Sequence, residues 1–235
     1  MKVRQIQTRI FKEGEDLAAF IQKHVPKLKE GAVLAIASKI VALSECRIVR
    51  VSSKKAKESL IRAESEWQEQ VLPDWWLTVR DGTVVVNAGI DESNADGNSI
   101  LLPKDSFAVA AELRKKLKKA YRVKQLGIVI TDSRVAPLRA GVTGVALGYA
   151  GFKGVRDYRG KKDIFGRRMN VTQTNVADSL ATTAALVMGE GNERQPLCII
   201  EGAPVEWTER VDKKETQISL KNDMYRSLFK RSKKR

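Results

Sequence analysis

The chain has 235 residues, of which 43% are hydrophobic and 30% charged, a balance typical of a globular protein with one large domain or two small ones. Its two cysteines, Cys46 and Cys198, are too few for a disulfide framework or a cysteine-rich zinc site. His24 is the only histidine, which argues against Ser-His-Asp hydrolases, Cys-His proteases and histidine-rich zinc hydrolases. It ends an expected amphipathic helix, so we expect it to have a packing or surface role. Acid–base chemistry would then fall to carboxylates, lysines or metal-bound groups.

The formal net charge of +15 predicts attraction to anions such as nucleotides, phosphorylated cofactors, RNA or acidic membranes. No apolar run approaches the length of a membrane span, and the N-terminus lacks the apolar core of a signal peptide. We therefore expect a cytoplasmic protein without a membrane segment.

The first half of the chain alternates between helical and extended patterns. Apolar residues at helical spacing predict a helix over 14–24. The apolar run 33–37 predicts a buried strand, and the polar stretch 52–70, rich in Lys and Glu, predicts a second helix. Between the β-rich runs of residues 77–86, Asp81-Gly82 predicts a two-residue hairpin.

The second half continues with a helix from Asp105, its expected cap, to about Tyr121, with Arg114 among the basic residues on its solvent side. A strand is expected to end at Asp132, and the glycine-rich stretch 141–154 matches neither a Walker loop nor a Rossmann fingerprint. Thr172 is expected to cap a helix ended by Gly189, and residues 197–200 form a final strand.

The C-terminal segment is strongly basic. Ile218, Met224 and Leu228 predict an amphipathic helix up to about Phe229, followed by a frayed end over 230–235. We expect residues 1–210 to form one catalytic unit, either undivided or made of two subdomains. Residues 211–235 are expected to form a basic helix and tail.

Two carboxylates are the strongest candidates for chemistry: Asp91, and Asp132 at the end of an apolar β-rich run. A carboxylate at a strand end can be reached by a metal and a phosphate, and oxygen ligands beside hydroxyls suit Mg²⁺ or Mn²⁺. A polar turn and a strand-end cap are the structural alternatives. A calcium loop is excluded because its twelfth position is Leu102 instead of a bidentate glutamate.

Basic and hydroxyl side chains lie beside these acids in the sequence. Ser133 can add a hydroxyl ligand, Arg139 can clamp a phosphate or carboxylate, and Lys39, next to Ser38, can neutralise a phosphate or simply be solvated. Residues 156–168 carry both signs densely, which indicates either anion recognition or a salt-bridged surface loop.

Taken in order, these segments resemble one family, the GTP-dependent gamma-glutamyl ligases of the deazaflavin coenzyme F420. The resemblance spans roughly residues 8–205, and Asn87-Ala-Gly-Ile-Asp91 is its most specific part. The matching stretches are residues 12–17, 37–41, 45–48, 87–94, 101–103, 130–133, 157–160, 163–167, 171–172, 177–178, 188–191 and 201–202.

The resemblance implies an α+β fold of two intertwined α/β parts, with mixed and antiparallel sheets and flanking helices, in a homodimer. It also implies that the protein uses GTP together with Mg²⁺ or Mn²⁺, and a monovalent cation is a further candidate cofactor. In the family reaction, GTP phosphorylates a carboxylate of an acceptor such as F420-0, and the amine of L-glutamate displaces phosphate to give an amide.

Carried over by position, the resemblance makes Asp91, Asp132 and Ser133 metal ligands, the serine standing where the family usually has threonine. Lys39 and Arg139 would contact phosphate or the acceptor carboxylate, and Asn87 would orient the site. Ser38, Lys39, Ser133, Arg134 and Arg139 form the expected nucleotide-binding set.

The chain departs from the family pattern at three places. The family's Gly-Arg pair is Val135-Ala136 here, so Arg134 would supply the guanidinium from one position away. Residues 174–179 lack two of the family's acids, and the shorter segment 53–76 lacks its Pro-Ser start and carries three tryptophans. These departures bear mainly on the acceptor.

Three other functions stay open on the sequence alone. The charge and the basic residues at 114–119 allow a nucleic-acid-binding protein that keeps the fold without the chemistry, although no recognised reading motif is present. A catalytically silent scaffold, or a ligase for another anionic acceptor, would also fit.

Overall fold

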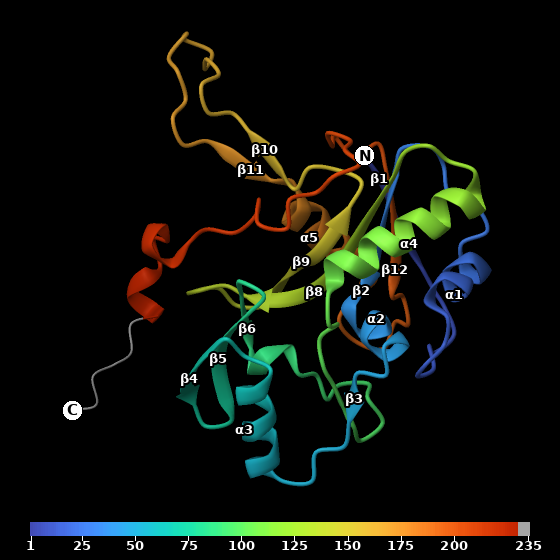
Figure 1. Cartoon of the computed structure of the whole chain (residues 1–235), viewed down its shortest axis with the longest axis vertical. Coiled ribbons are helices and arrows are strands. Elements are labelled where there is room, and N and C mark those ends of the chain that lie inside the picture. The colour runs from blue at the N-terminus through green and yellow to red at the C-terminus, as the bar shows by residue number, and fades with distance from the viewer. Residues whose placement is uncertain (230–235) are drawn as a thin grey trace.

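The computed structural model describes residues 1–229 and is built on a central five-stranded sheet in the order β1-β12-β2-β8-β9 (Figure 1). The β2–β8 pair is parallel and the other three pairs are antiparallel, so the sheet is mixed. Its strands are β1 (Lys2–Ile6), β12 (Leu197–Glu201), β2 (Ala32–Ala37), β8 (Leu126–Val135) and β9 (Val142–Ala150).

Helices cover both faces of this sheet. Leu34 and Ile36 of β2 face the cluster that includes α1 (Leu17–His24), α2 (Ser38–Ser44) and α4 (Ser106–Tyr121). Val33 and Ala35 face α5 (Val176–Met188) on the other side (Figure 1). Because successive side chains of a strand point to opposite faces, a strand covered twice must be apolar throughout, which explains the run Ala-Val-Leu-Ala-Ile-Ala.

A smaller region lies beside the central sheet, at the bottom of Figure 1. It comprises the pair β3 (Ile48–Val49) and β7 (Ser99–Ile100), helix α3 (Lys54–Ala63), and a three-stranded sheet of β4 (Trp67–Leu72), β5 (Trp75–Arg80) and β6 (Thr83–Val86). The predicted hairpin is confirmed, because Arg80 pairs with Thr83 and both Asp81 and Gly82 have positive φ, as a type I′ turn requires. The predicted α+β class is likewise confirmed.

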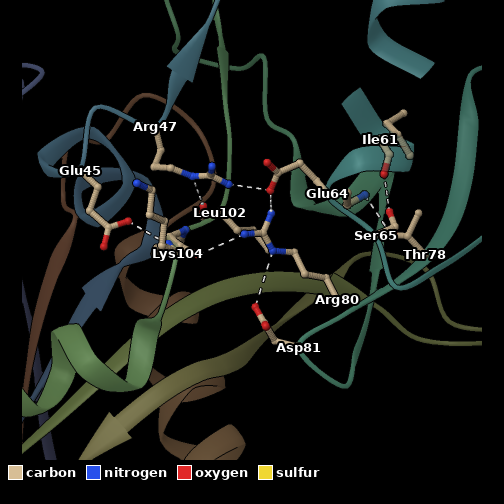
Figure 2. A network of polar contacts seen from close by, with 12 residues as sticks. Glu45, Arg47, Ile61, Glu64, Ser65, Thr78, Arg80, Asp81, Leu102 and Lys104 are labelled. Carbon is tan, nitrogen blue, oxygen red and sulfur yellow. Dashed lines mark hydrogen bonds and ion pairs between the residues drawn. The ribbon is translucent and has the colours of Figure 1, made fainter. Parts of the chain in front are cut away.

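A half-buried ion network joins the small region to the chain segment that leads into α4 (Figure 2). The Glu64 carboxylate accepts hydrogen bonds from Arg47, at 2.6 Å, and from Arg80. Arg47 also donates to the Leu102 carbonyl at 3.0 Å, and Arg80 donates to that of Pro103 at 3.2 Å. Since removing one member would leave a partly buried charge uncompensated, the network fixes how the small sheet meets this segment.

The stretch 156–168 belongs to an arm that projects from the body between β10 (Val155–Asp157) and β11 (Gln173–Asn175) (Figure 1). Its charges pair locally: Arg159 contacts Asp157 at 2.6 Å. The Asp163 carboxylate accepts the backbone N–H groups of Phe165 and Arg167 at 2.9 Å. These contacts match the salt-bridged surface loop that was one of the two interpretations of this stretch.

Three predicted boundaries are wrong. The helix expected over 52–70 ends at Ala63, because residues from Trp67 onward pair with β5 as strand β4. Helix α5 is capped by Asn175, whose side chain accepts the Asp178 N–H at 2.9 Å, and not by Thr172. Strand β8 does not stop at Asp132 but continues to Val135, since β9 pairs with it beyond that point.

The predicted solvent-side position of Arg114 is also wrong. Its side chain donates to the Leu126 carbonyl at 2.7 Å and forms a bidentate pair with Glu209 at 2.6 and 2.8 Å. Glu209 also pairs with Lys118 at 3.2 Å. The basic face proposed for nucleic acid is therefore partly occupied by the chain's own C-terminal segment.

Residues 203–229 follow the last strand and do not form the predicted amphipathic helix. Two short 3₁₀ turns, Leu220–Asn222 and Arg226–Phe229, take its place. The Asp223 side chain accepts the Tyr225 N–H at 2.7 Å, a local bond that competes with a helix, and Met224 is 95% exposed and so buries no apolar face. The frayed end expected over 230–235 lies outside the described residues. In residues 1–229 no helix combines the length and apolarity needed to cross a bilayer.

Candidate active site

A cavity of about 880 Å³ opens where the parallel strands β2 and β8 deliver their carboxyl ends. Ligand sites in α/β sheets favour this edge. Ala37 pairs with Thr131, so the residues that follow, Ser38 at the start of α2 and Asp132 in β8, lie beside each other. Further walls come from residues 8–11, from the loop 188–196 after α5, from residues 100–102, and from Gly89, Asp91, Ser93, Asn94 and Asp96.

Lys39 and Asp91 form the first polar pair of the cavity. The Lys39 Nζ lies 2.8 Å from an Asp91 carboxylate oxygen and donates to the Ser93 carbonyl at 2.9 Å. The Ser93 N–H donates to the other Asp91 oxygen at 2.7 Å, and the Asp91 backbone pairs with Ile100. Burial would raise the pKa of Asp91, but Lys39 and Ser93 hold it below its usual value. Asp91 is therefore an ionised carboxylate with a fixed orientation.

Asp132 is the second acid, and it behaves in the opposite way. Burial raises its pKa to about 6, and the negative charges of Asp91 and Glu190 add to the effect. Hydrogen bonds from the Ser133 N–H, at 2.8 Å, and from Ser38 oppose it only in part. Ionising Asp132 in this cavity therefore costs free energy, and a bound cation would offset that cost.

Glu190 completes an acidic group that the sequence did not predict. It lies in the loop after α5, and its side chain bonds to Ser133. Burial, and then the charge of Asp91, raises its pKa. The only local sequence signal is a charged residue between two glycines just after a helix end. Asn94, which donates to the Gly191 carbonyl at 3.1 Å and so connects two walls of the cavity, was also missed.

The donor chemistry of the cavity fits a hard divalent cation. Asp91, Asp132, Glu190 and the Ser133 hydroxyl supply oxygen atoms, whereas Lys39 is the residue that currently neutralises Asp91. Within residues 1–229 no three or more His, Cys, Asp or Glu side chains are grouped so that they could hold a metal ion by themselves. Magnesium is commonly held by one or two carboxylates together with substrate phosphates, and the acids here suit that arrangement.

Three of the predicted residues lie away from this group. The Asn87 side chain accepts the Trp76 N–H at 2.8 Å and so supports β5. Arg134 pairs with Asp178 at 3.0 Å. Arg139 lies in the exposed turn between β8 and β9 and does not line the cavity. Ser38, Lys39, Asp91, Asp132 and Ser133 are the predicted residues that the fold brings together.

Comparison with known proteins places the chain among the ligases. The chain belongs to the F420-0:gamma-glutamyl ligase family, whose model matches residues 5–202. A coenzyme F420:L-glutamate ligase of Archaeoglobus fulgidus is 36% identical, with 94% of each chain covered. Proteins of the same name are 37% identical in Methanopyrus kandleri, with 83% of each chain covered, and 37% identical in Halorubrum lacusprofundi, with 80% of this chain and 82% of the relative covered. The resemblance drawn from the sequence is thereby confirmed.

Proposed function

We propose that this protein uses GTP to join L-glutamate to a carboxylate of F420-0 or a closely related anionic acceptor. The observation that carries the proposal is the meeting of Asp91, Asp132 and Lys39, from three separate segments, in one large cavity. The names of the relatives supply the glutamate and the F420-type acceptor. GTP and the acyl phosphate are the parts that the proposal adds.

The proposed chemistry has two steps, because a carboxylate is a poor electrophile until it carries a good leaving group. An acceptor carboxylate oxygen attacks the γ-phosphorus of GTP, the bond to the bridging oxygen breaks, and GDP leaves. The glutamate nitrogen then attacks the acyl carbon, the carbon–oxygen bond to phosphate breaks, and a proton passes from nitrogen to water. The products are an amide, GDP and phosphate.

The residues of the cavity have distinct roles in this proposal. Lys39 places a positive charge beside Asp91, where it would neutralise a phosphate oxygen of the nucleotide. Asp91, Asp132 and Ser133 would hold Mg²⁺ or Mn²⁺, with Glu190 as a further ligand. When bound, the metal would offset negative charge on the transferring phosphoryl group. Arg134 and Arg139 remain predicted nucleotide contacts from the neighbouring strand and turn.

The test uses Asp91→Asn and Asp132→Asn in a titration with GTP in the presence and absence of Mn²⁺. We expect both variants to remain folded and to lose metal-dependent GTP binding, because each loses a carboxylate that would hold the metal ion. The wild type should release GDP only when F420-0 is present together with a nucleophile that takes the acyl group, and with L-glutamate the acceptor should show a matching mass gain. Retention of metal-dependent GTP binding in both variants would refute the assignment.

A further inference from the structure

A second cavity, of about 350 Å³, lies beside α3 and is separate from the one described above. Its apolar lining includes Ile61, which is 1% exposed, and Trp76, which is 7% exposed. Trp76 is held from two sides, by Arg62 over its ring at 4.8 Å and by the Asn87 side chain at its backbone N–H. The cavity therefore has a rigid apolar floor.

The two cavities share a wall. Asp91 and Ser93 line the first cavity, and Glu92, between them in the chain, lines the second. Neighbouring Cα atoms are about 3.8 Å apart, and the two linings place Asp91 and Ser93 toward one cavity and Glu92 toward the other. The backbone pairing of Asp91 with Ile100 holds this segment in place. A molecule bound against Glu92 thus lies next to the acids of the first cavity.

Charges of both signs surround the second cavity. Lys57 pairs with Glu92 at 2.8 Å, and Lys54 pairs with Asp74 at 2.6 Å. Glu58 adds a third carboxylate to the lining. A purely anionic ligand would meet three acids and two lysines. A ligand with both an ammonium and carboxylate groups can bind an acid through the ammonium and the lysines through its carboxylates.

Volume separates the two cavities further. Cavities of roughly 300–1,000 Å³ are typical of small-molecule sites. At about 880 Å³ the first has room for a nucleotide, whereas the second, at about 350 Å³, suits a much smaller molecule. In a two-step ligation the smaller substrate is the amino acid.

We propose that the second cavity binds L-glutamate and holds its amine at the segment 91–93 that borders both cavities, an inference that rests on the proposed ligase function. Glu92 receives the ammonium group, Lys57 the α-carboxylate and Lys54 the side-chain carboxylate, while the methylene groups lie on Ile61 and Trp76. This arrangement places the nitrogen nearest Asp91. From there the amine enters the first cavity, loses a proton to water and attacks the acyl carbon as phosphate leaves.

The direct test is calorimetric titration of L-glutamate into the wild type, Lys57→Met and Glu92→Gln, each alone and with GTP, Mn²⁺ and acceptor present. Lys55→Met is the matched control, because it removes the same charge from the same exposed helix but does not line the cavity. We expect at least a tenfold weaker glutamate Kd and a tenfold higher glutamate KM in the first two variants. The GTP KM should be unchanged, and the Lys55→Met control should match the wild type.

Hydroxylamine separates this inference from the proposed function. As a small neutral nucleophile, it can take the acyl group from an acyl phosphate without an amino-acid site, giving a hydroxamate and phosphate. Lys57→Met should still form GDP and hydroxamate at the wild-type rate. No hydroxamate in the wild type would contradict the acyl-phosphate step alone. Glutamate affinity that is the same in Lys57→Met as in Lys55→Met, or no glutamate binding to the wild type under either condition, would overturn the assignment of the second cavity.

Discussion

Asp132→Asn should make the nucleotide-free protein more stable even though it disables the site. Burial raises the pKa of the wild-type Asp132 carboxyl from 3.8 to about 6. Because the folded pKa is the higher one, folding disfavours the ionised form, and stability is lost as the pH rises from 3.8 through 6. Asparagine keeps an oxygen to accept the Ser133 N–H but carries no charge.

The magnitude follows from the same values. The difference between 3.8 and about 6 corresponds to about 3 kcal/mol at 1.36 kcal/mol per pKa unit. Water in the open cavity screens part of this cost, which leaves a gain of about 1–2 kcal/mol above pH 6. For a chain of this size, that gain equals a rise in Tm of about 2–8 °C.

Thermal unfolding followed by circular dichroism at pH 8 and pH 4, without nucleotide or metal, measures the effect. Asp132→Asn should exceed the wild type at pH 8, and most of its advantage should disappear at pH 4, where the wild-type carboxyl is largely protonated. Asp96→Asn is the control, since it removes an exposed carboxylate from the same cavity. An Asp132→Asn protein that is less stable at pH 8, or equally stabilised at both pH values, would refute the reasoning.

Three further outcomes are expected. Lys39→Met should lower GTP turnover about 100-fold or more in a GDP-release assay, and turnover at the wild-type rate would contradict its role. Arg114 lowers the pKa of Glu209 to about 2, so Glu209→Gln should cost up to about 1 kcal/mol in urea unfolding at pH 7. The Glu209 side chain is 71% exposed. Its contribution to the free energy of unfolding should decrease as the pH drops from 4.5 towards 2. A stability difference between wild type and variant that does not change with pH would argue against the ion pair. Gly144→Ala should cost about 1–3 kcal/mol, because the added methyl group would overlap the α5 backbone at Ala181, and an unchanged Tm would exclude that clash.

Features that depend on a few neighbouring residues were predictable from the sequence. Asp81-Gly82 set the hairpin because both positions need positive φ. Asp105 capped α4 because its side chain reaches the N–H of Ala108 three residues on, and Gly189 ended α5. The acids Asp91 and Asp132 also met in one cavity as predicted.

Features that depend on distant partners were not predictable. Arg114 resembles its lysine neighbours in sequence, and it is buried only because Glu209, 95 positions later, supplies its counter-charge. Glu190 joins the site through contacts with Ser133 and Asp91, which no local spacing reveals. Asp132 lies within a strand and not at its end, because the pairing with Val145 of β9 continues past it.

The pairing of Arg114 with Glu209 also bears on where the protein can be cut. The match to the family ends at residue 202, yet Glu209 supplies the acid for Arg114, and Glu215 accepts bonds from the Tyr149 hydroxyl at 2.7 Å and the Gly154 N–H at 2.6 Å. A fragment trimmed to the family boundary would leave the Arg114 guanidinium and the Tyr149 phenol without their carboxylate partners. Expression fragments of this protein should therefore retain residues 203–217 as part of the folded unit.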